Sequence, residues 1–390
     1  MKKHLAFVSQ PAQGHINPTI PLVKELVRRG HRVSYATGEP MCSTVRAAGA
    51  TAIQLPSRQL LNAPVEFTPE ALSAILDYYL ADARITFPVL ISHFEKDRPD
   101  AVCYDMVAFT GRMLAQKLSV PDIALIPSLA ANERSSVRNE FKPATFPKLI
   151  EFGQNMQALA AECGLILDAM PTWGMVASLN LVFIPREFQL DADTFDQRFH
   201  FLGPSPDAAR ERSHDWRPPV DQVPMLFVSL GTTTFNQRRS FFRMCIRAFA
   251  ESPWHVVMAI GERVCRDSIG EVPRNFEISP YFPQLEVLSH ARVFLSHAGM
   301  NSIMESLYCG VPLVMLPQMP EQEANARRVE DLRLGRRLVP AEVTVEVLRK
   351  TVAEVDRDPG LRTNLAQMKR LIRNCGGAVL GADVIEAHLA

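Results

Sequence analysis

The chain has 390 residues, 47% of them hydrophobic, and this length favours two α/β domains over a single compact core. Lysine plus arginine and aspartate plus glutamate each number 42, so there is no basic excess to bind nucleic acid or an anionic membrane surface. A negatively charged ligand must therefore be held by a local arrangement of groups.

The cysteines and the N-terminus indicate a cytoplasmic chain. The seven cysteines form no CxxC pair and are odd in number, which favours reduced thiols over a disulfide framework or a zinc site. The opening MKKHLAFVSQPAQGH has too few apolar residues for a signal peptide and is typical of a first strand. No uncharged run of about 18 apolar residues occurs, so no membrane span is expected.

The first half of the chain opens with a β-α-β pattern. Short apolar runs predict its strands, which are Leu5–Ser9, His31–Thr37, Ala101–Tyr104, Ile123–Ile126 and Leu181–Ile184. Between the first two strands, PTIPLVKELVRRG has helical apolar spacing and stops at Gly30. Residues 56–92 and 128–175 are predicted to be helical and less regular. A parallel sheet with helices on its faces is expected.

A loop-like stretch, GPSPDAARERSHDWRPPV, separates this half from a second one. We place an N-terminal domain at 1–204, an interdomain linker at 205–222 and a C-terminal domain at 223–375. The strands predicted after the linker are Met225–Leu230, His255–Ile260, Val293–Ser296 and Val311–Leu316. Arg238–Ala250 is predicted to be a helix, and the chain is predicted to be helical from Val343 onward.

The first loop, SQPAQGHINP, follows a strand, where open α/β sheets bind ligands. It has no GxGxxG, which argues against a nicotinamide cofactor. His15 is its only titratable residue and can accept a proton near neutral pH. Asp105, at the end of another strand, can hold the second ring nitrogen. The alternatives are a surface or capping histidine and an aspartate that caps a helix.

The stretch FLSHAGMNSIMESLYCGVPLVML passes from a strand through a polar loop into a helix that begins near Asn301. Such a helix N-terminus favours an anion, Gly299 permits close approach of a phosphate, and His297 can donate to it. Ser302 can also donate, and Glu305 can accept from a ribose diol. The alternative for the Ser302–Glu305 pair is a capping box.

Three further features border this predicted phosphate site. Gly231 and Thr232 form a second turn after a strand. Glu321 and Gln322 can bond sugar hydroxyls or can simply be a polar loop. Tyr281 can stack on a base or can be a core aromatic. The spacing of Asp191 and Asp193 matches the DxD of metal-dependent sugar transferases, but it is a short pattern far from the phosphate loop, so no metal site is predicted.

These residues together resemble the UDP-glycosyltransferase family, in its bacterial macrolide and flavonoid glucosyltransferase branch. The resemblance covers most of the chain. It is strongest in PAQGHINP, in RPDAVCYDMVAF and in YFPQLEVLSHARVFLSHAGMNSIMESLYCGVPLVMLPQMPEQEANA, which is similar to the donor signature of the family over more than forty positions.

The resemblance implies a GT-B fold, in which two Rossmann-like domains with parallel sheets face each other across a cleft. It also implies that a C-terminal helix, 376–390, crosses back to the first domain. By position, His15 matches the general base and Asp105 its partner. His297 and Ser302 match phosphate contacts, adjoined by Asn301, and Glu305 matches the ribose-binding acid. Gln284 matches the glutamine near the base, and Glu321 and Gln322 match the sugar-binding pair. Tyr281 stands where the family often has tryptophan.

The function implied is an inverting, metal-independent transfer of glucose from UDP-glucose to a hydroxyl of a lipophilic natural product, with no cofactor besides the UDP-sugar co-substrate. Two alternatives remain open from the residues: a UDP-sugar epimerase or hydrolase, and a non-catalytic nucleotide-sugar-binding module. The apolar segments 56–92 and 128–175 favour an acceptor pocket over the first, and the pair His15 and Asp105 counts against the second.

Overall fold

The computed structural model describes residues 1–57, 67–137, 147–167, 176–207, 216–219, 223–231 and 238–390. The chain forms two compact units. Unit 1 comprises residues 1–63, 68–205 and 375–390, and unit 2 comprises residues 64–67 and 206–374. Of the predicted linker 205–222, the structure describes residues 205–207 and 216–219.

Unit 1 is built on a parallel sheet of seven strands in the order β3-β2-β1-β4-β5-β6-β7. The strands are β1 His4–Val8, β2 Arg32–Gly38, β3 Thr51–Leu55, β4 Ala101–Asp105, β5 Asp122–Ile126, β6 Leu179–Val182 and β7 Phe199–Phe201. The central strands β1 and β4 are buried along their whole length, because helices cover both faces of the sheet.

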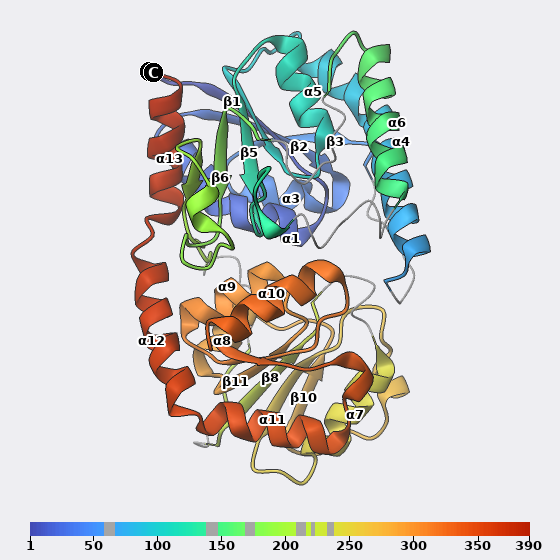
Figure 1. Ribbon diagram of the computed structural model, residues 1–390, viewed down its shortest axis with the longest axis vertical. Helices are drawn as coiled ribbons and strands as arrows, with labels where there is room; N and C mark the ends of the chain where they lie inside the picture. Colours follow the sequence, from blue (N-terminus) through green and yellow to red (C-terminus); the bar gives the residue numbers. More distant parts are fainter. Residues whose placement is uncertain (58–66, 138–146, 168–175, 208–215, 220–222, 232–237) are drawn as a thin grey trace. The chain divides into compact units, whose positions relative to one another are not determined.

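The helices of unit 1 follow the strands in the order of a doubly wound fold. They are α1 Gln13–Ile16, α2 Ile20–Arg28, α3 Glu39–Ala47, α4 Pro69–Phe94, α5 Phe109–Leu118, α6 Lys148–Glu162 and α13 Gly377–His388, with short 3-10 turns η1 Asn17–Thr19 and η3 Ala192–Thr194. The long helices α4 and α6 lie side by side (Figure 1).

Helix α13 belongs to unit 1 although it comes after unit 2 in the sequence. It packs on α2, where Leu22, Ala382 and Ile385 share one buried cluster. Charged groups join the same two helices, since Arg29 donates to Asp383 and Glu386 at 2.6 and 2.7 Å. Unit 1 is therefore assembled from two separate stretches of chain.

Unit 2 has a parallel sheet of six strands in the order β10-β9-β8-β11-β12-β13. The strands are β8 Met225–Ser229, β9 His255–Ala259, β10 Phe276–Ser279, β11 Val293–Ser296, β12 Leu313–Met315 and β13 Gly335–Arg337. The helices are α7 Arg239–Phe249, α8 Gln284–His290, α9 Met300–Cys309, α10 Pro320–Asp331, α11 Val345–Arg357 and α12 Pro359–Arg373, with 3-10 turns η6 Arg266–Ile269 and η7 Pro340–Glu342.

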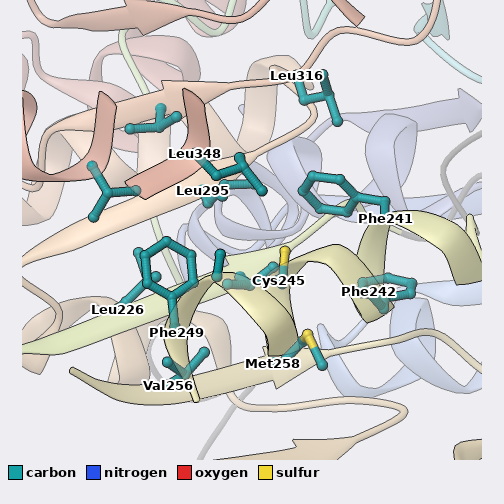
Figure 2. Close-up of a cluster of buried hydrophobic side chains, with 14 of the residues drawn as sticks. Leu226, Phe241, Phe242, Cys245, Phe249, Val256, Met258, Leu295, Leu316 and Leu348 are labelled. Carbon is teal, nitrogen blue, oxygen red and sulfur yellow. The ribbon is translucent and has the colours of Figure 1, made fainter. Parts of the chain in front are cut away.

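The core of unit 2 lies between its sheet and the helices α7 and α11 (Figure 2). Helix α7 places Phe241, Phe242, Cys245 and Phe249 against the sheet, because these residues recur at helical spacing. From α11, Leu348 enters the same cluster. This packing fixes the strands whose carboxyl ends carry the candidate donor site.

Some predicted elements differ from the structure. Within 56–92 and 128–175, the described helices are only α4 and α6, and residues 58–66, 138–146 and 168–175 lie outside the described residues. Four strands were not predicted: β3, β7, β10 and β13. Each is the edge strand of its sheet. Among the described residues, no helix combines the length and apolar character that a membrane crossing requires.

Candidate active site

His15 lies in the short helix α1, which directly follows β1, and Asp105 is the last residue of the neighbouring strand β4. Parallel neighbours end at the same edge of a sheet, so the two side chains meet there. The Nδ1 atom of His15 is 2.8 Å from Oδ2 of Asp105. The structure thus brings together the predicted base and its predicted partner.

This hydrogen bond determines which nitrogen of His15 can accept a proton. A carboxylate can only accept a hydrogen bond, so Nδ1 carries the hydrogen and the neutral ring has its lone pair on Nε2. Asp105 is fully buried, whereas the His15 side chain keeps 28% of its surface exposed. The ring is therefore accessible at the edge of the sheet while its partner is not.

One alternative was that Asp105 caps a helix, and that alternative is wrong. Helix α5 begins at Phe109 with Ala108 as its N-cap, and that cap has no side-chain hydrogen bond. The second carboxylate oxygen, Oδ1, instead accepts from the backbone N–H of Val107 at 3.0 Å. With one oxygen fixed by the backbone, the other is oriented toward His15, which is the arrangement that holds an imidazole in one tautomer.

In unit 2, His297 follows β11 and lies beside Gly231, which follows the neighbouring strand β8. A Cβ atom added to Gly231 would lie 2.6 Å from Cε1 of His297, and one added to Gly299 would also collide with the ring. Gly231 has φ +75°, a conformation that suits glycine. The two glycines, predicted as phosphate contacts, therefore also make room for the imidazole.

The electrostatic setting of His297 keeps its ring neutral. The residue is 7% exposed, and burial lowers its pKa to about 4, with the Ser229 backbone acting weakly in the opposite direction. Among the described residues, Nδ1 of His297 has no hydrogen-bond partner of normal geometry.

Helix α9 starts at Met300, with Gly299 as its N-cap and no side-chain capping bond. Ser302 therefore lies inside the helix, and the alternative that Ser302 and Glu305 form a capping box is wrong. Gln284, at the start of α8, donates to Oε2 of Glu305 at 2.6 Å and to Ser302 Oγ at 3.3 Å. The three residues predicted to contact phosphate, ribose and base thus form one cluster.

The predicted sugar-binding pair lies in the first turn of α10 and not in a loop, and its two residues are held in different ways. Gln322 is 2% exposed, and its Oε1 accepts from the backbone N–H of Gln318 at 2.8 Å. Glu321 is only half-buried, and its Oε1 accepts from Nδ2 of Asn325 at 3.3 Å. The side-chain oxygen of Gln322 is therefore engaged by the loop that precedes α10, while Glu321 is the more accessible of the two.

Asn325 was not singled out from the sequence. It is completely buried in α10, and its Nδ2 also donates to the backbone carbonyl of Ala298 at 3.1 Å. Ala298 has φ +66°, a left-handed conformation that is unfavourable for a residue with a Cβ. Asn325 thus links Glu321 to the loop between His297 and Gly299 through hydrogen bonds. No short-range pattern in the sequence predicts this contact.

The remaining predicted residues are placed as follows. Tyr281 follows β10 and is 40% exposed, so the alternative that it is a core aromatic is wrong. Asn301 is half-buried in the first turn of α9. Thr232 lies outside the described residues.

Of the two DxD residues, Asp191 has a local structural contact in unit 1. Asp191 accepts from the backbone N–H of Ser136 at 2.6 Å, and Asp193 is exposed in η3. No group of three or more histidine, cysteine, aspartate or glutamate side chains suited to a metal occurs in the part of the chain that the structure describes.

Each unit is a Rossmann-like domain built on a parallel sheet, with the candidate site residues at the carboxyl edge of that sheet. The chain is similar over its whole length to solved GT-B glycosyltransferases. With the glycotransferase of kitacinnamycin it shares 34% identity and a TM-score of 0.89, with both chains covered completely. With the calicheamicin glycosyltransferase CalG4 it shares 33% identity and a TM-score of 0.85, covering 100% of this chain and 98% of the other.

Sequence comparison identifies the family. Residues 215–375 match the model of the family described as "UDP-glucoronosyl and UDP-glucosyl transferase". The NDP-glycosyltransferase YjiC of Bacillus licheniformis is 37% identical, covering 100% of this chain and 98% of its own. The demethyllactenocin mycarosyltransferase of Streptomyces fradiae is 38% identical, covering 99% and 87%. The chain belongs to the UDP-glycosyltransferase family, in its bacterial macrolide branch, and is a glycosyltransferase.

Proposed function

We propose that the protein transfers glucose from UDP-glucose to a hydroxyl of a lipophilic natural product, with inversion at the anomeric carbon and with His15 as the general base. The observation that carries this proposal is the 2.8 Å hydrogen bond between Nδ1 of His15 and the buried carboxylate of Asp105. It supports a base role for Nε2, because Asp105 stabilises the imidazolium that forms when that nitrogen takes a proton.

In the proposed reaction, the acceptor oxygen attacks the anomeric carbon as its proton passes to Nε2 of His15. The bond between that carbon and the diphosphate oxygen breaks, and UDP leaves with the bonding electron pair. Attack opposite the leaving group turns an α-linked donor into a β-glucoside. Holding the two substrates in line can account for about 7–11 kcal/mol of the barrier.

The proposed donor site uses groups at the carboxyl edge of the sheet in unit 2. The N-terminus of the ten-residue helix α9 and the buried ring of His297 are suited to the diphosphate. Glu305 is suited to the ribose diol and Tyr281 to the base. A neutral His297 can donate one hydrogen bond to a phosphate oxygen without being ionised, and this donor is most valuable where leaving-group charge develops.

The proposed acceptor class is supported by the relatives and by unit 1. The mycarosyltransferase of Streptomyces fradiae and the oleandomycin glycosyltransferase of Streptomyces antibioticus act, by their names, on macrolide-type natural products. In unit 1, Tyr78 and Tyr79 of α4 are half-buried, and the Tyr79 ring lies 6.3 Å from that of Phe109. Half-buried aromatic surface of this kind suits an apolar acceptor.

We further propose that transfer needs neither a metal nor another cofactor, and that the UDP-sugar and the acceptor are the only partners. The free thiols favour a reducing compartment such as the cytoplasm. Membership in a transferase family favours transfer over the epimerase, hydrolase and binding-module alternatives.

The experiment that tests this proposal compares the wild-type protein with His15→Ala and with a control, His290→Ala, at an exposed histidine of α8. Each is incubated with UDP-glucose and a panel of phenols and macrolides, with and without EDTA, and mass spectrometry measures added hexose. We expect the His15 variant to lose about 10²–10⁴-fold in rate. The control should match the wild type, and EDTA should change nothing.

Calorimetry with UDP separates catalysis from binding in the same variants. We expect the UDP affinity of His15→Ala to equal that of the wild type, because His15 belongs to unit 1 and the proposed donor residues to unit 2. Unchanged turnover in His15→Ala would remove the residue from the mechanism. An α-linked product, read from the anomeric coupling in NMR, would exclude single displacement.

A further inference from the structure

A second buried carboxylate, Asp82, lies near the His15 loop and has no part in the mechanism above. It belongs to α4 and is 5% exposed. Its Oδ2 accepts from Nε2 of Gln10 at 3.0 Å, and its Oδ1 accepts from Oγ of Ser57 at 2.5 Å. Gln10 follows β1 and Ser57 follows β3, so Asp82 joins the carboxyl ends of two strands to one helix.

Gln10 is held by its carbonyl oxygen as well as by its amide nitrogen. The hydroxyl of Tyr78 donates to Oε1 of Gln10 at 3.2 Å. Tyr78 and Asp82 are four residues apart in α4 and therefore lie on one face of that helix. Ser57 is also 3.5 Å from the same Oε1, but its single hydroxyl hydrogen is better placed on Asp82 at 2.5 Å.

Backbone hydrogen bonds connect Gln10 to His15. The carbonyl of Gln10 accepts from the N–H of Ala12 at 2.8 Å, and the carbonyl of Ala12 accepts from the N–H of His15 at 3.0 Å. The intervening Pro11 is buried and packs against Gly38, where an added Cβ would collide with it. The side chain of Gln10 therefore anchors a short, constrained path that ends at the histidine.

Burying a carboxylate at this place costs free energy that an apolar side chain of the same size would not cost. Burial raises the pKa of Asp82, and the hydrogen bonds from Ser57 and Gln10 act in the opposite direction. Replacing a buried carboxylate together with its hydrogen-bond partners by apolar side chains of the same shape can cost little stability, so stability alone does not require this network. The group is better explained by the orientation that it imposes on Gln10 than by packing alone.

We propose that Asp82 is a positioning residue for His15: through Gln10 it holds the first turn of α1 in the place where Nδ1 of His15 meets Asp105. The inference deepens the proposed function, since it rests on His15 being the base. His15 is thereby set by two carboxylates, Asp105 directly and Asp82 through the loop.

The test uses two substitutions at the same position. Asp82→Leu removes the acceptors and leaves Nε2 of Gln10 without its partner. Asp82→Asn can keep the network, because its Oδ1 accepts from Gln10 while its Nδ2 donates to Ser57, whose hydroxyl can reverse its role. If positioning is correct, Asn behaves like the wild type and Leu does not. If Asp82 acts through its charge alone, both variants fail, and that result would overturn the inference.

The primary readout is the tautomer of His15, which needs no acceptor. In full-length protein labelled with ¹⁵N-histidine, the ring signals of His15 are assigned by difference against His15→Asn. We expect a ring protonated on Nδ1 in the wild type and in Asp82→Asn, and a mixture of tautomers in Asp82→Leu. The other nine of the ten histidines report folding, and unchanged signals from them exclude a general loss of structure. A wild-type His15 spectrum in a folded Asp82→Leu would overturn the inference.

A second variant covers the case in which Asp82→Leu does not fold. Gln10→Met acts from the other end of the network on a half-buried side chain, and it should give the same mixture of tautomers. A His15 spectrum like that of the wild type in Gln10→Met would also overturn the inference. Tyr78→Phe removes one donor to Gln10 and should shift the spectrum least.

Turnover gives a third measurement that separates this inference from the proposed function. With UDP-glucose and any acceptor that the wild type glucosylates, Asp82→Leu should lower kcat by roughly 10–10²-fold and leave UDP affinity unchanged. If His15→Ala retains full activity, the general-base proposal fails, and the tautomer measurement still decides whether Asp82 positions the ring. If His15→Ala is inactive while Asp82→Leu is fully active, only the positioning inference fails.

Discussion

The sheets that carry His15 and His297 share the order of six strands, and yet the two histidines have opposite surroundings. In each unit the third and fourth strands of the sheet order carry the candidate residues. Unit 1 has His15 after β1 and Asp105 at the end of β4. Unit 2 has Gly231 after β8 and His297 after β11. The histidine of unit 2 thus stands at the strand position that the aspartate occupies in unit 1.

The different positions of the two histidines give their imidazole rings different properties. His15 is partly exposed, and its Nδ1 is bonded to a carboxylate, which leaves Nε2 as the nitrogen that can accept a proton. His297 is buried beside two glycines, and its pKa of about 4 keeps it neutral at physiological pH. In the proposed mechanism, the same residue type therefore serves as a proton acceptor in unit 1 and as a neutral donor in unit 2, according to its neighbours.

The largest effect that can break this comparison is expected from His297→Ala. If the ring is a neutral donor to the leaving group, its loss should lower kcat by about 10²–10³-fold. UDP affinity should fall as well, whereas His15→Ala should spare it. Stopped assays with UDP-glucose and calorimetry with UDP measure the two quantities. An unaltered affinity for UDP in the His297 variant would show that the two histidines do not divide the work in this way.

The pH dependence of the stability of unit 2 gives a second test of this comparison. The pKa of His297 is about 4 in the folded protein and near 6.5 in an unfolded chain, so the unfolded chain binds the proton first. The stabilisation is complete above about pH 6.5 and is lost as the pH falls toward 4, by an amount on the order of 3 kcal/mol.

His297→Gln is the matched control for that measurement, because glutamine does not titrate. Urea unfolding at pH 7 and at pH 4.5 should show a smaller acid loss for the variant than for the wild type. Other groups contribute equally to both proteins, so the difference isolates His297. Equal losses would mean that the ring is not kept neutral by burial.

The smallest effect is expected at Glu305, which contrasts a ligand contact with a local structural role. If Glu305 accepts from the ribose diol, Glu305→Ala should weaken UDP by roughly tenfold and 2′-deoxy-UDP by less. Calorimetry with the two nucleotides measures the difference. Equal losses for both would show that Glu305 serves only to hold Gln284, to which it is bonded at 2.6 Å.

The fold was predictable from the sequence where strands are central and buried on both faces. β1, β4, β8 and β11 are continuous apolar runs, and they were found. The four missed strands are the edges of the two sheets. Their sequences, such as FEIS in β10 and GRR in β13, mix polar and apolar residues because an edge strand is only partly covered. Local patterns therefore underestimate the width of each sheet.

The site was predictable where a candidate functional side chain lies at the end of a strand. The positions of His15, Asp105 and His297 followed from that rule together with the family resemblance. Asp82 and Asn325 could not be found in this way, because their partners Gln10 and Ala298 lie 72 and 27 residues away. The capping-box alternative at Ser302 also failed because the helix begins two residues earlier, at Met300.

The place of helix α13 has a consequence for biosynthesis. Residues 377–388 are translated only after all of unit 2, yet they cover Leu22 and Leu202 and bind Arg29 of unit 1. The nascent amino-terminal half therefore leaves the ribosome with an apolar surface uncovered. Exposed apolar surface of this kind binds chaperones or leads to aggregation. Helix α13 therefore completes the fold of unit 1, which the first residues of the chain begin.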